Sequence, residues 1–382
     1  MRMLVACDAF KGALTAHEAC AAVAAGLGAA WPGCDIDLMP VADGGEGSLG
    51  VLEAVFARRE VLGVMDACGA PLRADVGLAP GEVLVESAQA VGWQVPGAQP
   101  WRFGSAGVGV MVAQAVDLLG GQGVVHLALG GSRTVDGGLG FLQALGARAL
   151  DCAGRDVAPG LTGLLSLAAL DVAPAWQRLG GVSLRVWCDV QSPLLGAGGA
   201  ALYMAQKGLD DVGVRAATAA LERFAALAEA KSGVSVGERP GGGAAGGLGA
   251  AALLLDGALV SGADEVLRRV DAEERVRRAT WVWGGEGRVD GQSGAGKAMM
   301  ALARLCRRQA RPLVLFCGED AGGEALLAEG VCAVFPIGPG PRSLDVALSA
   351  TRGDLQRCAT QVLRVLKWGC GGASIESCNG GS

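Results

Sequence analysis

The chain has 382 residues, of which 51% are apolar and only 4% aromatic, with a formal net charge of −6. This length allows a large core and two domains, and the acidic balance excludes a broad basic surface for nucleic acid. No run of about 18 uninterrupted apolar residues is present, and Asp8 comes too early for a signal peptide. Twelve scattered cysteines without a CxxC spacing fit a reduced environment. We therefore expect a cytoplasmic protein.

The N-terminal region predicts a strand, a loop and a helix, and the same unit recurs along the chain. Residues 3–7 are an apolar strand, and Thr15 and Glu18 have capping-box spacing for a helix that reaches residue 30. The further predicted strands are 36–40, 124–130, 184–190, 280–285, 312–318 and 331–338, and the further predicted helices are 48–57, 139–150, 298–308 and 343–366.

Strands that alternate with helices predict an α/β fold with parallel sheets covered on both faces. The segment 65–278 differs, because it contains short apolar stretches typical of antiparallel strands and a polar helical stretch over 213–233. We therefore predict one doubly wound domain from residues 1–64 and 279–367, with 65–278 inserted as a second α/β domain. The glycine- and serine-rich tail, 368–382, is predicted to be disordered.

Polar, glycine-rich loops follow several of these strands, and such loops bind ligands at the carboxyl ends of parallel strands. Asp8 and Lys11 stand between a strand end and a helix start, where an anion is favoured, although Asp8 could equally cap the turn. Asp43 and Glu46 could share one magnesium ion, or could serve the turn and the helix dipole.

Three later loops carry further candidates. Ser132 and Arg133 lie in "GGSRTVDGG", where the arginine could clamp a carboxylate with two hydrogen bonds. Asp189 ends an apolar strand, a position that suits a general base or a metal ligand. Glu286 and Arg288 lie in "EGRVD", where a buried ion pair is the alternative to a role in binding. His126, in an apolar strand, is interpreted as a core residue.

Two glycine-rich patterns resemble nucleotide-binding motifs without satisfying them. Residues 291–298, "GQSGAGKA", match GxxxxGK but lack the hydroxyl that binds magnesium. Residues 241–246, "GGGAAG", match GxGxxG but follow no strand. Either stretch could still bind phosphate through backbone N–H groups.

The lysines point to phosphate chemistry. Only five of the 32 basic residues are lysines, and Lys11, Lys207 and Lys297 lie beside glycine. Lysines in such positions can act as point charges for phosphate, although ordinary surface lysines are the alternative. Cations, carboxylates and free N–H groups without a thiol or histidine base suit phosphoryl transfer, in which the protein positions groups and neutralises charge.

The chain resembles the bacterial glycerate kinases of the first class over about residues 1–366. The motifs that carry the resemblance occur in the family's order: "DAFKGALTAHEA", "PVADGGEGS", "SAGVGVMVAQA", "LALGGSRTVDGGLGFLQALG", "CDVQSPLLGAGGAALYMAQKG", "PGGGAAGGLGAA" and "GGEGRVDGQSGAGK". The sequence departs from the family at Ala9 and Ala13, where members tend to have serine, and at Arg133 and Val135, where they tend to have alanine and asparagine. The groups lost at Ala9, Ala13 and Val135 donate and accept hydrogen bonds but carry no charge, so we expect these departures to affect fine specificity more than reaction class.

The resemblance implies ATP-dependent phosphorylation of D-glycerate, usually at the 2-hydroxyl, in a cleft between two α/β domains, one of them flavodoxin-like. The residues that we assign to this reaction fall into three groups. Asp189 is the predicted base, assisted by Lys11; the candidates for substrate or phosphate are Asp8, Ser105, Ser132, Arg133, Lys207, Arg288 and Lys297; and the candidates for Mg²⁺ are Asp43, Glu46 and Glu286.

Alternatives to this reaction remain open at the level of sequence. They are phosphorylation of the 3-hydroxyl, a related small hydroxy acid as substrate, a non-catalytic organic-acid binding protein, and a dehydrogenase that uses the 241–246 loop. The expected partners are therefore small molecules, with no nucleic acid or membrane. The oligomeric state is open, a homodimer included.

Overall fold

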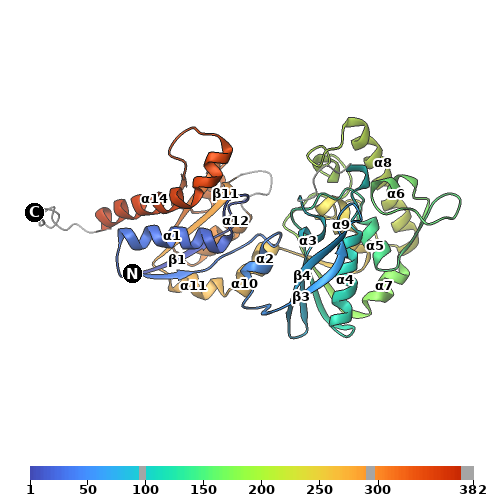
Figure 1. The fold of residues 1–382 in the computed structure, drawn as a ribbon, viewed down its shortest axis with the longest axis horizontal. Coiled ribbons are helices and arrows are strands. Elements are labelled where there is room, and N and C mark those ends of the chain that lie inside the picture. Colours follow the sequence, from blue (N-terminus) through green and yellow to red (C-terminus); the bar gives the residue numbers. More distant parts are fainter. Residues whose placement is uncertain (94–99, 290–296, 371–382) are drawn as a thin grey trace, which may run out of the picture. The chain divides into compact units, whose positions relative to one another are not determined.

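The structure, a computed structural model, describes residues 1–93, 100–289 and 297–370. The chain divides into two compact units. Unit 1 consists of Met1–Val41 and Val270–Ser382, and unit 2 consists of Ala42–Arg269. Each unit has its own sheet (Figure 1).

Unit 1 contains a five-stranded parallel sheet. Its strands are β1 (Arg2–Cys7), β2 (Asp35–Leu38), β11 (Trp281–Val289), β12 (Leu313–Asp320) and β13 (Ala333–Pro336). The order across the sheet is β2-β1-β11-β12-β13, with every neighbouring pair parallel. Counted within the unit, this is the 2-1-3-4-5 order of flavodoxin-like folds. The predicted doubly wound domain is therefore confirmed in its architecture.

Helices surround this sheet because its strands are apolar on both faces. They are α1 (Ala16–Ala30), α11 (Ala272–Arg278), α12 (Lys297–Arg308), α13 (Glu324–Ala328) and α14 (Leu344–Cys370). Helices α1 and α14 pack closely together on one face (Figure 1). The contact depends on Gly26, since a Cβ there would lie 2.3 Å from the carbonyl oxygen of Gln356.

Unit 2 is built on a six-stranded mixed sheet in the order β10-β9-β6-β5-β4-β3. Its strands are β3 (Arg58–Met65), β4 (Pro71–Ala79), β5 (Glu82–Glu86), β6 (Gln122–Ala128), β9 (Gly181–Trp187) and β10 (Ala258–Val260). Strands β3, β4 and β5 are antiparallel, whereas β5, β6, β9 and β10 are parallel. A separate antiparallel pair joins β7 (Arg148–Leu150) and β8 (Ala169–Asp171).

The helices of unit 2 cover this sheet and enclose one continuous apolar core (Figure 1). They are α2 (Ser48–Val51), α3 (Ala88–Val91), α4 (Ala106–Leu118), α5 (Leu139–Ala144), α6 (Leu161–Ser166), α7 (Ala173–Leu179), α8 (Asp211–Ser232), α9 (Ala244–Leu254) and α10 (Gly262–Arg269), with short 3₁₀ helices η1 (Pro100–Arg102) and η2 (Ala200–Tyr203).

Several predicted elements are confirmed, and two helices are shorter than predicted. Thr15 and Glu18 form the capping box at the start of α1. The helix predicted over 48–57 ends at Val51, and the one predicted over 139–150 ends at Ala144. The second difference arises because residues 148–150 pair with β8 as a strand, a contact with residues about 20 positions further along the chain.

The bounds of the two units differ from those predicted, 64/65 and 278/279. Residues 58–65 belong to unit 2 because β3 pairs with β4 along its whole length. Helix α14 continues to Cys370, and the rest of the predicted tail lies outside the described residues.

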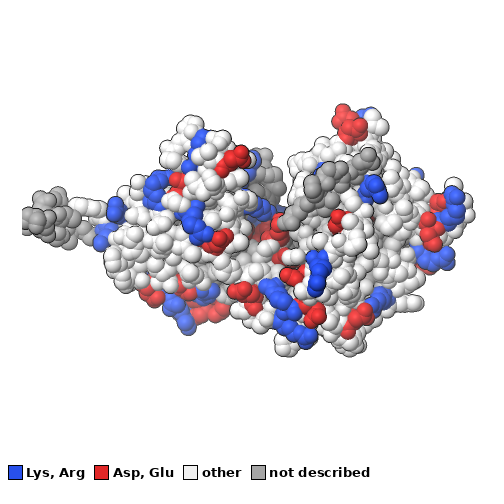
Figure 2. Space-filling model, in the orientation of Figure 1, with Lys and Arg blue, Asp and Glu red and all other residues white. Residues whose placement is uncertain are grey.

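Both signs of charge occur on the face of the molecule that Figure 2 draws. Figure 2 shows lysine and arginine interspersed with aspartate and glutamate on the face that it draws. Among the residues that the structure describes, no helix is both long and apolar enough to cross a membrane.

Candidate functional site

The polar loops of unit 2 follow four neighbouring parallel strands. Strands β5, β6, β9 and β10 lie side by side, so their carboxyl ends meet at one edge of the sheet. Glu86, Gly130, Asp189 and Ser261 lie at or just after these ends. Ligands of α/β proteins bind at this edge. The polar loops that follow these strands therefore lie at one edge of the sheet of unit 2.

The loop 42–48 is held against two of these strand ends by close backbone contacts. A Cβ on Gly44 would lie 2.3 Å from the Cα of Gly262, and one on Gly45 would lie 3.0 Å from the Cα of Gly130. Neither approach leaves room for a larger residue, and Gly44 also has a φ of +80°. The glycines of "ADGGEGS" therefore allow the close backbone packing that fixes the position of this loop.

Asp43 and Glu46 make different contacts in this loop. The Oδ1 atom of Asp43 accepts a hydrogen bond from the N–H of Gly45 at 2.9 Å. Glu46 is exposed, and its Oε2 lies 3.2 Å from the position that a Cβ on Gly131 would take. Asp43 thus makes the predicted turn contact, and this contact leaves its second carboxylate oxygen for other partners.

Glu86 is a buried carboxylate at this edge that sequence reasoning missed. Its side chain is 2% exposed and accepts hydrogen bonds from the N–H of Leu49 at 2.5 Å and from Gln89 at 3.4 Å. Burial raises the pKa of this carboxyl group. Glu86 thereby fixes the start of α2 and the end of the loop that carries Asp43 and Glu46. The available signal was an acid that ends the apolar strand "EVLVE".

Asp189 lies directly after β9 and binds the first turn of α10. Its Oδ1 accepts from the N–H of Gly262 at 3.0 Å, and its Oδ2 accepts from the N–H of Ala263 at 3.1 Å. This capping role was not predicted. The two backbone N–H groups fix the orientation of the carboxylate at the carboxyl end of β9. Its role as a base stays a prediction.

Arg133 is held in the loop after β6 by aromatic side chains. Its guanidinium carbon lies 4.6 Å from the ring centroid of Phe103 and 5.4 Å from that of Trp93, and its backbone N–H donates to the carbonyl of Val91 at 2.9 Å. Stacking engages the faces of a guanidinium, whereas its N–H groups point outward in its plane. The neighbouring Ser132 is 7% exposed.

Ser105 and Lys207 are buried, whereas the predicted contact with substrate or phosphate requires an accessible side chain. The hydroxyl of Ser105 is fully buried, donates to Oδ2 of Asp136 at 2.9 Å and accepts from the N–H of Phe141 at 2.9 Å. Lys207 is 7% exposed, and its Nζ donates to the carbonyl of Thr134 at 2.8 Å. Both groups hold the loop after β6 from inside the unit.

The candidates of unit 1 lie at the topological switch point of its sheet. In the order β2-β1-β11-β12-β13, connections leave in opposite directions from β1 and β11, and flavodoxin-like folds bind ligands there. Asp8 and Lys11 follow β1, and the N–H of Asp8 donates to the carbonyl of Gly285 at 2.8 Å. Lys11 is exposed, and Glu286, in β11, is 6% exposed.

Arg288 forms an ion pair at the same edge, although not a buried one. Its guanidinium lies 3.5 Å from the carboxylate of Glu319, its register partner on β12, and both side chains are more than half exposed. The predicted alternative was a buried ion pair; Arg288 does form an ion pair, but the pair is exposed. Exposed pairs of this kind contribute at most about 1 kcal/mol to stability.

The phosphate-loop-like motif is only partly described. Lys297 begins α12, and residues 290–296, including Asp290, lie outside the described residues. The GxGxxG-like stretch at 241–246 is fully described and packs against protein. A Cβ on Gly243 would lie 2.3 Å from the carbonyl oxygen of Pro193, and one on Gly246 would lie 1.9 Å from that of Thr134.

The predicted magnesium ligands are three carboxylates, Asp43, Glu46 and Glu286. Within the described ranges, no group of three or more His, Cys, Asp and Glu side chains is placed to hold a metal ion. Asp43 and Glu46 belong to unit 2 and Glu286 to unit 1. Magnesium commonly takes one or two carboxylates together with water and substrate phosphates, so these oxygen donors fit an ion that arrives with a nucleotide rather than a closed protein cage.

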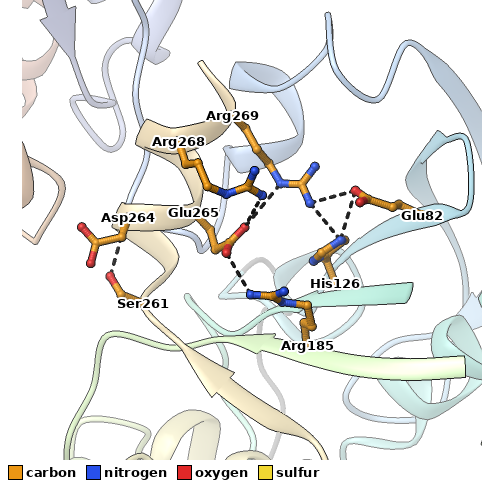
Figure 3. Close-up of polar contacts among 8 residues, drawn as sticks. All are labelled: Glu82, His126, Arg185, Ser261, Asp264, Glu265, Arg268 and Arg269. Carbon is orange, nitrogen blue, oxygen red and sulfur yellow. Dashed lines mark hydrogen bonds and ion pairs between the residues drawn. The ribbon is translucent and has the colours of Figure 1, made fainter. Parts of the chain in front are cut away.

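A partly buried polar cluster lies between the sheet of unit 2 and α10 (Figure 3). Glu265 on α10 contacts Arg185 at 3.1 Å and Arg268 at 2.9 Å. Arg269 lies 2.8 Å from the carboxylate of Glu82 and 2.9 Å from Nε2 of His126. The cluster anchors the C-terminal end of the helix whose first turn binds Asp189.

His126 is 2% exposed. Its Nε2 atom lies 2.9 Å from the guanidinium of Arg269, which only donates, and 3.2 Å from the carboxylate of Glu82, which only accepts, so the tautomer sets which of the two it bonds. Burial, followed by the positive charge of Arg269, lowers the pKa of His126 to about 4. The interpretation of His126 as a core residue is confirmed.

Acidification is expected to destabilise the protein through His126. Its pKa is lower in the folded state, about 4, than the unfolded value of about 6.5, so its stabilising contribution is complete above pH 6.5 and is lost between about pH 6.5 and pH 4. The loss is at most about 3 kcal/mol. Urea unfolding at several pH values should show a smaller pH dependence for His126→Gln. The exposed His17→Gln is the control, and equal slopes for both variants would contradict the assignment.

Together, the fold and the two sets of loops define a two-unit α/β protein whose polar loops lie at the carboxyl ends of parallel strands. The model of the glycerate kinase family matches residues 3–367. The chain is 35% identical to the glycerate kinase of Bacillus subtilis strain 168, over 96% of this chain and 98% of that one. It is 31% identical to the glycerate 2-kinase of Escherichia coli K12, over 97% and 99%.

A solved structure gives the same result. A crystal structure from Salmonella typhimurium LT2, provisionally assigned as glycerate kinase 2, superposes with a TM-score of 0.81 at 34% identity, covering 97% of this chain and 99% of that one. The chain belongs to the glycerate kinase family and is an enzyme of the kinase class.

Proposed function

We propose that this protein transfers the γ-phosphoryl group of ATP to D-glycerate and forms 2-phosphoglycerate. The observation that carries the proposal is the family match along nearly the whole chain, residues 3–367. The name of the Escherichia coli relative, glycerate 2-kinase, favours the 2-hydroxyl as acceptor.

Unit 1 is proposed to bind the nucleotide. Lys11 is exposed at the switch point between β1 and β11, and Lys297 begins α12, so both can offer positive charge to phosphate oxygens. Asp8 would orient the loop that carries Lys11. Lys207 is left out of this set, because its ammonium group is buried against a backbone carbonyl.

Unit 2 is proposed to bind glycerate. Arg133 would hold the substrate carboxylate, and Ser132 lies beside it in the same loop. We prefer Arg133 to Arg288, because Arg133 lies in the same unit as Asp189, whereas Arg288 belongs to unit 1. Asp189 lies at the same edge, and its two hydrogen bonds to the backbone of α10 fix the orientation of its carboxylate.

In the proposed reaction, the 2-hydroxyl oxygen attacks the γ-phosphorus, the bond from that phosphorus to the β–γ bridging oxygen breaks, and ADP leaves. The hydroxyl proton passes to the carboxylate of Asp189. Asp43, Glu46 and Glu286 would supply oxygen ligands to magnesium, which neutralises phosphate charge when bound. The predicted inter-domain cleft, in which the groups of both units would act together, stays a prediction.

Phosphorus NMR tests this proposal directly. Incubation with MgATP and D-glycerate should produce ADP and the resonance of 2-phosphoglycerate. A 3-phosphoglycerate resonance would instead establish the 3-hydroxyl as acceptor, and ADP formation with another hydroxy acid but not glycerate would establish a different substrate. If glycerate binds but no ADP forms with any acceptor, the protein is a binding protein and the proposal fails.

Substitutions in the two units should separate the two substrates. We expect Lys11→Met to raise the KM for ATP, and Arg133→Met to raise the KM for glycerate, each by about 10- to 100-fold, because each removes a hydrogen bond to a charged group. The other KM should change little in each case. Lys231→Met, an exposed lysine at the end of α8, is the control. An unchanged KM for ATP in Lys11→Met would refute the nucleotide assignment, and an unchanged KM for glycerate in Arg133→Met would refute the glycerate assignment.

A further inference from the structure

Lys207 occupies an unusual place for a lysine of a phosphate-binding enzyme. It lies in the turn after η2, is 7% exposed, and donates from Nζ to the carbonyl of Thr134 at 2.8 Å. Burial lowers the pKa of this ammonium group to about 8, and the negative charge of Asp136 acts in the opposite direction. Burying an ammonium group is costly, so its partner is the first indication of its role.

That partner, Thr134, is the residue after Arg133 in the loop that follows β6. The Thr134 hydroxyl donates to the carbonyl of Ala245 at 2.8 Å, and the N–H of Gly137 donates to the carbonyl of Gly246 at 3.0 Å. The loop is therefore fastened to the glycine-rich start of α9. Residues 245–247 all have positive φ there, between 51° and 102°.

Asp136 fastens the other side of the same loop. Its fully buried carboxylate accepts from the N–H and hydroxyl of Ser105 at 2.8 and 2.9 Å, from the N–H of Gly138 at 3.2 Å and from that of Gly140 at 3.1 Å. Lys207 and Asp136 thus bind the backbone on the inner side of the loop that presents Ser132 and Arg133.

A direct phosphate contact would require a different environment. Lysine serves phosphate as a flexible, hydrated point charge. Here the ammonium group is removed from water, and its bond to Thr134 would have to break for it to turn outward. A hydrogen bond from a charged donor to a buried carbonyl is a strong constraint on that carbonyl.

We propose that Lys207 is a positioning residue for glycerate: its bond to the carbonyl of Thr134 sets the orientation of Arg133, and it makes no contact with the nucleotide. This inference rests on the proposed function, because it takes Arg133 as the group that binds glycerate. It also gives the 241–247 stretch a role, as the surface against which the Arg133 loop is fixed.

Steady-state kinetics of two variants test the proposal. Lys207→Met fills similar space without a donor and should raise the KM for glycerate by about 10-fold or more, with the KM for ATP within about 2-fold of the wild type. Lys207→Gln is one atom shorter but keeps an N–H donor, so it should recover part of the affinity for glycerate. Lys231→Met, on the exposed end of α8, should match the wild type.

Two kinetic outcomes would overturn the proposal. An increase in the KM for ATP with an unchanged KM for glycerate would show a phosphate-binding lysine. Equal losses in Lys207→Gln and Lys207→Met would show that the charge, and not the bond to the carbonyl, is what matters.

Hydrogen exchange gives a readout that does not depend on activity. Peptides over residues 130–138 should exchange faster in Lys207→Met than in the wild type, while peptides of unit 1 should be unchanged. If the wild type shows no glycerate kinase activity but this local change occurs, the proposed function fails and the positioning role of Lys207 stands. If exchange over 130–138 is unchanged, the positioning role fails whatever the activity. Should Lys207→Met not fold, the same comparison is made with Lys207→Gln.

Discussion

Replacing Asp189 with asparagine is expected to lower kcat by about 10²- to 10⁴-fold, because the variant lacks the carboxylate that accepts the proton of the attacking hydroxyl. The fold should survive. An asparagine oxygen can still accept from the N–H of Gly262 or Ala263, and asparagine is a good residue at a helix start. We expect a loss of only about 1–2 kcal/mol in the free energy of unfolding.

The experiment needs a control for the capping role alone. Asp210 caps α8 by accepting from the N–H of Gly213 at 2.7 Å, and we assign it no part in the reaction. Asp210→Asn should therefore cost a similar stability with little change in kcat. Turnover and urea unfolding should be measured on both variants. A kcat for Asp189→Asn near that of Asp210→Asn would show that Asp189 serves only as a cap.

Gly246→Ala is expected to destabilise unit 2 more than any single exposed substitution, by about 3 kcal/mol or more. Two costs combine at this position. Gly246 has a φ of +69°, which L side chains rarely adopt, and its Cβ would lie 1.9 Å from the carbonyl oxygen of Thr134. That oxygen belongs to backbone and already accepts from Lys207, so the loop that carries Arg133 would have to shift.

Gly233→Ala separates the two costs. Gly233 ends α8 with a φ of +72°, and its Cβ would have no described atom within 4 Å. It should lose only the conformational cost, about 1–2 kcal/mol. Urea unfolding measures both variants, and the KM for glycerate should rise only in Gly246→Ala. Similar stability for the two variants would show that the loop yields easily and that the 241–247 stretch does not fix it.

The candidate site could be predicted from the sequence to the level of its loops. Acidic and basic residues that directly follow apolar strands mark the carboxyl ends of those strands, and this placed Arg133 and Asp189 at one edge of the inserted domain. The same reasoning placed Lys11 and Glu286 at one edge of unit 1. Local pattern suffices here, because a parallel strand and the loop after it are adjacent in the chain. Asp43 follows β2 and was predicted to belong to the other domain; only the structure packs its loop against Gly130 and Gly262 of unit 2.

Which way each side chain faces could not be predicted in this manner. Lys207 and Ser105 follow the same glycine-rich patterns as Lys11 and Ser132, yet both hold backbone from inside the unit. Glu86 was missed because one acid at the end of a strand is a weak signal. Burial depends on the residues that pack on a loop from elsewhere in the chain, such as the 245–247 turn against Thr134.

The sequence by itself determined the α/β class, the apolar strands and the start of α1, since each depends on the order of residues a few positions apart. Only the tertiary structure decided that residues 58–65 join unit 2, that residues 148–150 form a strand, and that Asp189 binds the first turn of α10. These features arise from hydrogen bonds between segments about 10 to 70 residues apart. The free energy of these hydrogen bonds exceeds that of the local secondary-structure preference. No short stretch of sequence contains both partners of such a bond.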